Sequence, residues 1–406
     1  MVLALTLLPA ILLALRVAAG PVLVEDNIIS LPLSRRLNFT SANVVQQDLA
    51  RLKKFKIGKA GVNEERAVVA EPVDNQVVSY IASVGVGSPA TTYELIVDTG
   101  SSNTWVGSGT KYVQTSTSTK TSNTVSVSYG SGSFSGTEFI DQVTLAPGLV
   151  ISKQSIGVAS RSSGFSGTDG ILGIGPVDLT QGTLTNAQST LIPTVTDNLF
   201  SQGTISANLI GISFEPARTE DDANGSISFG GTDSTKFTGS VAFTPVTSTL
   251  PAGDYWGINQ SITYGGTTIL ASTAGIVDTG TTLIYIATNA YTKYVSATGA
   301  VLDNNTGLLR ITSAQFAALQ NLNFVIGGVT YSLTPNAQIW PRSLNTAIGG
   351  SASSIYLVVS DWGSNSGEGL DFINGYAFLE RFYSVFDTTN KQIGFATTPF
   401  TTATTN

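Results

Sequence analysis

The sequence of 406 residues contains neither cysteine nor histidine. Their absence excludes Ser-His-Asp and Cys-His catalysis, and it also excludes zinc sites built from His or Cys ligands. No disulfide bond can form, so cysteine usage carries no information about the compartment in which the protein works. Carboxylates are therefore the side chains that remain for acid–base chemistry.

Charged residues are also scarce, at 12% of the chain, whereas glycine, serine and threonine are abundant. Val, Ile, Thr and Phe dominate the segments that look ordered, which predicts a mostly β protein with many turns. Helices are expected at 189–202, 288–297 and 313–319. A chain of this length allows one large domain or two of medium size.

The few charges are distributed unevenly along the chain. Residues 67–406 contain 11 Lys and Arg against 22 Asp and Glu, a net charge of −11, and residues 1–66 contain 9 against 5, a net charge of +4. An acidic body is a poor partner for nucleic acid. With so few cations it also gains little positive charge when its carboxylates become protonated, so we expect little self-repulsion in acid.

Residues 1–20 form an apolar segment that ends in small residues, with Val17-Ala18-Ala19 as a cleavage site. The pattern predicts a secretory signal peptide and therefore a secreted, extracellular protein. A membrane anchor is the alternative, but the apolar run is short for spanning a bilayer. No later segment is apolar enough to span a membrane, so we expect no membrane association of the mature form.

One short motif occurs twice, 180 positions apart. Residues 96–100 and 276–280 both read I-V-D-T-G, and each is followed by Ser or Thr. The apolar residues predict a buried strand and Thr-Gly predicts a sharp turn, so Asp98 and Asp278 would each lie on a loop at the end of a strand. Two unrelated β-turns in a chain rich in Gly and Thr are the plainer interpretation.

Two such loops facing each other would bring the carboxylates of Asp98 and Asp278 together. Adjacent carboxylates share one proton, so the pair holds an acid and a base at the same time. Both copies of the motif lie in one chain, so no dimer is needed to assemble the pair and we expect a monomer. This chemistry requires no metal and no organic cofactor.

Further motifs follow in a defined order. They are Trp105, Y-G-S-G-S at 129–133, D-G-I-L-G at 169–173 and F-L-E-R-F-Y-S-V-F-D at 378–387. Together with the two D-T-G copies, they resemble the pepsin-like aspartic proteases (peptidase family A1), and the secreted fungal members in particular, from about residue 77 to 398. One departure is D-F-I-N-G at 371–375, which has Asn374 within the usual Ile-Leu-Gly pattern.

The resemblance implies a mostly β, bilobal pepsin-like fold, in which two pseudo-twofold-related lobes enclose a cleft. It also implies a zymogen with a signal peptide at 1–20, a basic propeptide at 21–70, an N-terminal lobe at 71–236 and a C-terminal lobe at 237–406. The activity it implies is aspartic-type endopeptidase hydrolysis of polypeptides at acidic pH, sensitive to inhibitors of the pepstatin type.

In the mechanism that the resemblance implies, Asp98 and Asp278 activate a water that attacks the peptide bond. Ser101 and Thr281 would hydrogen-bond the two carboxylates from outside. The remaining expected site residues contact the substrate, and they are Gly100, Gly280, Thr282, Tyr129, Gly130, Ser131 and Trp105.

Residues 129–133 would form the tip of a flap that closes over the substrate, with the Tyr129 hydroxyl hydrogen-bonded to Trp105. Some fungal relatives carry Asp at position 131 and accept Lys before the cleaved bond, whereas this chain carries Ser131. The resemblance therefore predicts cleavage between large hydrophobic residues.

Basic residues are concentrated in the implied propeptide, where residues 44–55 could form a short helix. In the zymogens of this family a cation pairs with the two aspartates at neutral pH and leaves them in acid, and we expect Lys53, Lys54 or Lys56 in that role. The sequence from Ala67 resembles a mature amino terminus. A flexible basic linker is the plainer interpretation of the same composition.

Three other functions are compatible with parts of the sequence. A glycosidase also uses two carboxylates, but no aromatic residues for sugar binding accompany the D-T-G loops. A secreted binding protein with an inactive site would be expected to have lost an Asp, the flap Tyr or a D-T-G glycine, and all are intact. A β-rich adhesion module would leave the duplicated loops unexplained.

Overall fold

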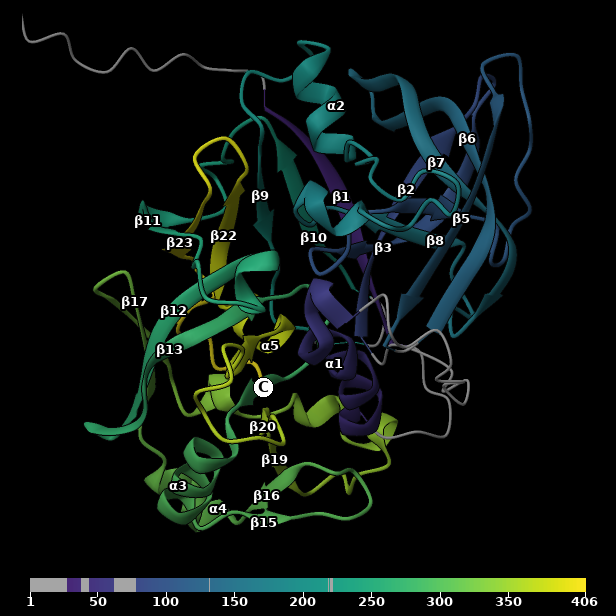
Figure 1. Ribbon diagram of the computed structural model, residues 1–406. Helices are drawn as coiled ribbons and strands as arrows, with labels where there is room; N and C mark the ends of the chain where they lie inside the picture. Colours follow the sequence, from purple (N-terminus) through teal and green to yellow (C-terminus); the bar gives the residue numbers. More distant parts are fainter. Residues whose placement is uncertain (1–27, 38–43, 62–77, 131, 218, 220–221) are drawn as a thin grey trace, which may run out of the picture.

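The computed structural model describes residues 28–37, 44–61, 78–130, 132–217, 219 and 222–406. The expected signal peptide, Ser131 and the expected mature start at Ala67 lie outside the described residues. Most of the regular structure consists of strands, arranged in one large and two smaller sheets (Figure 1). The expectation of a mostly β fold is therefore confirmed.

The largest sheet contains 13 strands and draws them from both halves of the chain. Its strand order is β11-β23-β22-β9-β10-β1-β2-β3-β8-β4-β7-β6-β5. These strands are β1 (Ile29–Leu37), β2 (Val78–Val86), β3 (Thr91–Asp98), β4 (Thr104–Val106), β5 (Thr119–Tyr129), β6 (Gly132–Ala146), β7 (Leu149–Ser163), β8 (Gly170–Gly173), β9 (Leu209–Ser213), β10 (Asp222–Phe229), β11 (Thr238–Pro245), β22 (Phe382–Asp387) and β23 (Gln392–Thr397). Because β11, β22 and β23 come from the second half, the two halves share a sheet.

The second sheet has seven strands and belongs to the second half alone, in the order β18-β17-β12-β13-β21-β14-β20. These strands are β12 (Gly257–Tyr264), β13 (Thr267–Val277), β14 (Ile284–Ile286), β17 (Leu322–Ile326), β18 (Val329–Leu333), β20 (Val359–Asp361) and β21 (Phe372–Asn374). A third sheet consists of β15 (Val301–Leu302), β16 (Leu309–Ile311) and β19 (Ile355–Leu357).

Helices connect the strands and are short, except for α1. The α-helices are α1 (Val44–Gly61), α2 (Val195–Ser201), α3 (Thr288–Thr298), α4 (Ser313–Ala318) and α5 (Tyr376–Leu379). Single turns of 3₁₀ helix are η1 (Val177–Thr180), η2 (Ala252–Asp254), η3 (Asn336–Gln338), η4 (Arg342–Leu344) and η5 (Thr346–Ile348).

The starts of three helices agree with the sequence-based expectation, and one does not. Helices α1, α3 and α4 begin at the expected residues, although α1 continues to Gly61. The expectation for α2 was wrong by six residues at its start. Thr194 forms a capping box with Asp197, in which each side chain accepts a hydrogen bond from the other's backbone N–H, and this fixes the first turn there.

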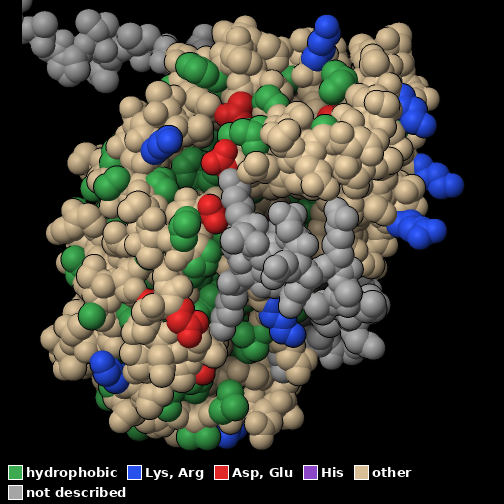
Figure 2. All heavy atoms as spheres, in the orientation of Figure 1, with side chains coloured by type: hydrophobic (Ala, Val, Ile, Leu, Met, Phe, Trp, Pro, Cys, Tyr) green, Lys and Arg blue, Asp and Glu red, His purple; other side chains and the backbone are tan. Residues whose placement is uncertain are grey.

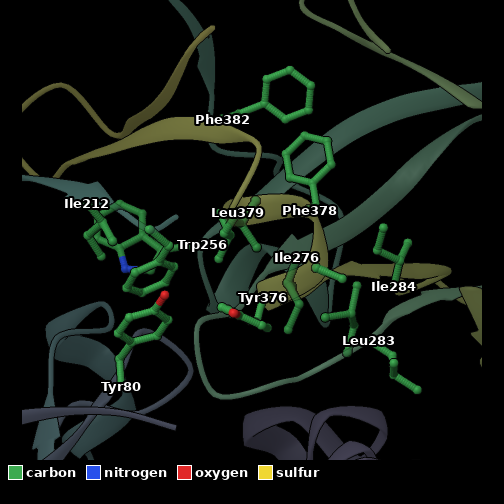
Figure 3. Packing of buried hydrophobic residues seen from close by; sticks show 14 of the residues in the cluster. Tyr80, Ile212, Trp256, Ile276, Leu283, Ile284, Tyr376, Phe378, Leu379 and Phe382 are labelled. Atoms are coloured by element: carbon green, nitrogen blue, oxygen red, sulfur yellow. The ribbon is translucent and has the colours of Figure 1, made fainter. Parts of the chain in front are cut away.

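The hydrophobic core runs through both halves of the protein. Figure 3 shows members of this core from both halves, among them Tyr80 of β2, Ile212 of β9 and Tyr376 of α5, and the rings of Tyr80 and Tyr376 lie 5.5 Å apart. Tyr80 also stacks on Phe214 with ring centroids 3.8 Å apart. A shared core of this kind holds the two I-V-D-T-G loops in a fixed mutual position, because close-packed interiors deform little.

The basic segment that precedes the protease-like sequence is part of this fold. Strand β1 lies between β2 and β10 in the large sheet, and its Arg35 is buried with Nη1 donating to the carbonyl oxygen of Thr219. Helix α1 lies at the junction of the two halves (Figure 1). The segment therefore belongs to the packed structure and is not a flexible linker within its described residues.

The surface reflects the low content of charged residues. Figure 2 shows a face in which neutral side chains and backbone predominate, with Asp and Glu near the middle and several Lys and Arg side chains at one edge. Within the described residues no helix is both long and apolar enough to cross a membrane.

Candidate active site

The two I-V-D-T-G segments meet at the centre of the protein, and each loop hydrogen-bonds the other. The backbone N–H of Thr99 donates to Oγ1 of Thr279 at 3.0 Å, and the backbone N–H of Thr279 donates to Oγ1 of Thr99 at 3.0 Å. The Thr279 hydroxyl also donates to the carbonyl oxygen of Val97 at 3.1 Å. All the polar groups involved are buried, so the two loops are tied together without solvent.

Each loop holds its aspartate in the same way. In the first, the N–H of Gly100 donates to Asp98 Oδ1 at 2.9 Å and the Ser101 hydroxyl donates to Asp98 Oδ2 at 2.5 Å. Both contacts favour the ionised form of the carboxylate. Ser101 thus lies against the Asp98 carboxylate, which has no exposed surface, and Gly100, which was expected to contact the substrate, gives its N–H to the same carboxylate.

The second loop repeats this arrangement around Asp278. The N–H of Gly280 donates to Asp278 Oδ1 at 3.2 Å, and the Thr281 hydroxyl donates to Oδ2 at 2.5 Å. One hydroxyl and one backbone N–H thus orient each carboxylate, and Oδ1 of both aspartates lies against the same nitrogen atom, Nη2 of Arg51. Two carboxylates oriented toward one point can share a proton and polarise a bound group.

In this structure the bound group is the side chain of Arg51 from helix α1. Its Nη2 lies 2.5 Å from Asp98 Oδ1 and 3.0 Å from Asp278 Oδ1, and its Nε donates to Asp278 Oδ2 at 2.9 Å. The planar guanidinium presents donors in a fixed fork, so a single side chain reaches both carboxylates. Arg51 thus occupies the position at which a lysine was expected, so the expectation was wrong for Lys53 and Lys54, and the side chain of Lys56 lies outside the described part of the structure.

The ion pair shifts the ionisation of its members. Burial favours a neutral Asp98, but the charge of Arg51 and the hydrogen bonds from Ser101, Arg51 and Gly100 outweigh it and hold the pKa of Asp98 below its usual range. Burial likewise opposes the charge on Arg51, yet the two carboxylates together raise the pKa of Arg51. Asp98 and Arg51 thus each favour the charged form of the other.

A second residue of α1 contacts the loop that follows Asp278. The carboxylate of Asp48, one helical turn before Arg51, accepts from the N–H of Thr282 at 3.1 Å and from the N–H of Leu283 at 3.0 Å. Burial raises the pKa of Asp48 to about 6, although these hydrogen bonds and Arg51 oppose the shift. We did not predict this contact, but Asp48 is the one acidic residue between residues 27 and 63, which distinguishes it in the sequence.

The expected flap residues lie against the same helix. Tyr129 ends β5, and the Nζ of Lys54 lies 4.9 Å from the centroid of its ring. Burial lowers the pKa of Lys54 to about 8, partly offset by attraction to Asp98. A Cβ atom at Gly130 would collide with the carbonyl oxygen of Ala50, so the flap and the helix are in direct backbone contact.

Burial raises the pKa of Tyr129 and a side-chain interaction with Trp105 opposes that shift, so the two expected partners do interact, although the contact falls short of ordinary hydrogen-bond geometry. The two rings lie 6.5 Å apart at an angle of 26°, and the Tyr129 hydroxyl and the Trp105 Nε1 are buried without a hydrogen-bond partner among the described residues. Trp105 stacks instead on Phe134, with centroids 4.3 Å apart. These ring positions occur while α1 lies against Tyr129, with Nζ of Lys54 over the tyrosine ring.

Helix α1 also buries apolar side chains in the same region. Leu52 and Phe55 are each only 1% exposed, and the ring of Phe55 meets that of Tyr255 edge to face at 5.0 Å. A Cβ atom at Gly100 would lie 2.6 Å from Nη2 of Arg51, and one at Gly280 would overlap the guanidinium. The two glycines therefore leave the space that the occupant of the aspartate pair needs.

This combination of two tied D-T-G loops in a bilobal β fold defines an aspartic protease. Residues 79–398 match the family model described as eukaryotic aspartyl protease, and the chain belongs to that family. It is thus an aspartic-type endopeptidase, a hydrolase that acts on polypeptides.

Individual relatives agree with this assignment. The chain is 70% identical to polyporopepsin from Irpex lacteus over 336 residues, which are 82% of this chain and 98% of the relative. It is 32% identical to rhizopuspepsin-1 from Rhizopus niveus over 378 residues, 88% of this chain and 90% of the relative. The crystal structure of an aspartic proteinase from Irpex lacteus superposes with a TM-score of 0.81 at 62% identity, covering 93% of this chain and all of that one. The bilobal pepsin-like fold is thereby confirmed.

Proposed function

We propose that this aspartic endopeptidase is made as a secreted zymogen. In this proposal, residues 1–20 are a signal peptide, residues 21–70 are a propeptide, and residues 71–236 and 237–406 are the two lobes of the mature enzyme. The enzyme then works outside the cell as a monomer, after the propeptide has been removed.

The observation that carries this proposal is the position of Arg51. Its guanidinium contacts both Asp98 and Asp278 and occupies the point at which a substrate carbonyl and a water would react. A chain folded in this way has no access for substrate, because α1 lies under the flap and on the aspartate pair. The precursor is therefore inactive until the helix leaves.

The catalytic step that we propose uses the pair without any covalent intermediate. One ionised carboxylate of the pair takes a proton from a water, and the other carboxyl group donates its proton to the carbonyl oxygen of the substrate. The tetrahedral intermediate then collapses as a proton passes to the leaving nitrogen. Ser101 and Thr281 keep the carboxylates oriented, while Thr282, Gly130 and Ser131 bind the substrate backbone.

Acid would release the helix because Arg51 requires both carboxylates to be ionised. A free aspartate pair retains one proton in mild acid, since two adjacent negative charges repel. Docking of Arg51 displaces that proton, so docking weakens by about tenfold for each pH unit below the upper pKa of the free pair. The lowered pKa of Asp98 has the same sign, because it stabilises the docked state at neutral pH and this stabilisation is lost as the pH falls.

The substrate preference that we propose is for large hydrophobic residues on either side of the cleaved bond. Leu52 and Phe55 bury apolar side chains beside the aspartate pair, and Phe55 packs against Tyr255. These side chains occupy space that substrate side chains would fill after the helix has left. With Ser131 at the flap tip, the sequence offers no carboxylate there for a substrate lysine.

The proposal is tested by following digestion of an unfolded protein by the intact precursor. We expect no cleavage at neutral pH, cleavage after transfer to acid, and loss of that cleavage with a pepstatin-type inhibitor, to which the family is typically sensitive. A precursor that digests the substrate equally well before and after acid treatment would show that α1 does not inhibit.

A further inference from the structure

The second catalytic loop is supported by a buried pair of amides that the first loop lacks. Asn374 ends β21 and Gln260 lies on β12, on either side of β13, the strand that leads into Asp278. Gln260 Nε2 donates to Asn374 Oδ1 at 3.1 Å, and Asn374 Nδ2 donates to Gln260 Oε1 at 2.8 Å. Neither residue is more than 1% exposed, so the two amides satisfy each other away from water.

The main chain of Asn374 is in direct contact with the catalytic loop. Its carbonyl oxygen accepts from the N–H of Asp278 at 3.2 Å, and its Cα lies opposite both Val277 on β13 and Ile284 on β14. The two strands that enter and leave the loop thus meet at this one residue. Two positions later, the N–H of Tyr376 donates to the carbonyl oxygen of Thr281, the residue whose hydroxyl holds Asp278.

The first half of the protein provides an internal comparison. The counterpart of Asn374 in the first half is Leu172. Leu172 lies opposite Val97 and Thr104, which are 180 positions before Val277 and Ile284, the two residues opposite Asn374. Strand register also identifies Val84 as the counterpart of Gln260. Val84 pairs with Tyr93, which lies five residues before Asp98, and Gln260 pairs with Thr273, which lies five residues before Asp278.

In the first half these two positions are therefore both apolar and fully buried, and in the second half both are amides. A single polar replacement would leave an unpaired amide in the core, whereas the two together form a closed pair. Apolar side chains pack without a preferred direction, but two reciprocal hydrogen bonds fix the distance and orientation of the groups that form them.

We propose that Gln260 and Asn374 are positioning residues, which set the orientation of the Asp278 carboxylate by fixing β21 against β12 across the strand that carries it. They act through the main chain of Asn374 and touch no reacting atom. The proposal rests on the proposed catalytic role of Asp278.

The test compares four variants of the acid-activated enzyme, at a temperature at which all are folded: Asn374→Leu, Gln260→Val, the double variant that recreates the Leu172 and Val84 pair of the first half, and Asp278→Asn. We expect each single variant to lower kcat by about tenfold, because small misplacement of a catalytic group is costly, with KM within about twofold. The double variant leaves no unpaired amide, so we expect it to recover the Tm but not kcat.

Recovery of the wild-type kcat by the double variant would overturn the proposal, because the amides would then only fill space. Single variants that lower the Tm and leave kcat unchanged would also overturn it. If either single variant fails to fold, the kcat of the double variant alone tests the proposal. An active Asp278→Asn variant would instead contradict the proposed function, so the two failures are distinguishable.

Discussion

Thr99 and Thr279 each donate a backbone N–H to the other's hydroxyl, at 3.0 Å in both directions. The two residues lie 180 positions apart and occupy the same place in the two copies of I-V-D-T-G. Their reciprocal contact fixes the distance between the two aspartate loops, because the hydroxyl of each also reaches the strand end of the opposite half. The aspartate pair is therefore built by both halves together.

Replacement of Thr99 by Val should weaken this connection at nearly constant volume. The change leaves the N–H of Thr279 buried without a partner, at a cost of roughly 1–3 kcal/mol in the free energy of unfolding. We also expect kcat to fall by about tenfold or more, because the carboxylates lose their fixed separation. Denaturant unfolding and steady-state kinetics measure the two effects, and the equivalent Thr279→Val variant should behave alike. An unchanged kcat in both would contradict this role.

Replacement of Arg51 by Ala should activate the precursor at a higher pH than the wild type requires. The change leaves two buried carboxylates without their cation, which typically destabilises by about 3–5 kcal/mol, so α1 should no longer hold the cleft. The measurement is the rate of peptide cleavage by the intact precursor in mild acid, at a pH at which a free aspartate pair keeps its shared proton but the wild-type precursor is still latent. Lys53→Ala is the matched control, because Lys53 lies on the same helix and is exposed. Equal latency of the two variants would refute the assignment of Arg51.

Asp48 should make activation less steeply dependent on pH. Burial raises the pKa of Asp48 from 3.8 to about 6 when the helix is docked. Between pH 6 and 4, Asp48 is therefore protonated in the docked state but still ionised in the undocked state. Docking takes up this proton, so the docked state becomes more stable as the pH falls. This opposes the proton that docking releases from the aspartate pair. In the Asp48→Asn variant only the release remains.

The measurement for Asp48 is the slope of the logarithm of the activation rate against pH between pH 4 and 6. We expect the slope to be steeper in Asp48→Asn than in the wild-type precursor, by up to about one proton. A slope equal to that of the wild type would show that Asp48 stays ionised throughout. A shallower slope in Asp48→Asn would show that docking lowers the pKa of Asp48, the opposite of the shift that burial produces.

The sequence was sufficient for the parts of the site that are repeated within it. The two I-V-D-T-G copies predicted loops with equivalent roles, and the structure places Asp98, Asp278, Ser101 and Thr281 together accordingly. Each of these contacts spans only a few residues along the chain, so local sequence determines it. The start of α1 at Val44 was predictable for the same reason.

Contacts that depend on docking were not predictable in the same way. Successive side chains on a helix point about 100° apart, so the residue that meets the aspartate pair depends on how α1 is rotated in the cleft. The structure selects Arg51 and, on the same face, Asp48. The partner of Asn374 was equally hidden, because Gln260 lies 114 positions earlier and only strand register brings the two together.

In the proposed mechanism, Asp98 and Asp278 act as one catalytic pair after α1 has left. Cleavage of an unfolded protein at mildly acidic pH should be compared between the wild-type enzyme and Asp98→Asn, after removal of the propeptide has been confirmed for both. We predict cleavage by the wild type that pepstatin abolishes, and a loss in Asp98→Asn of several orders of magnitude in kcat. Cleavage that survives both the inhibitor and the substitution would contradict the account and place the active site elsewhere.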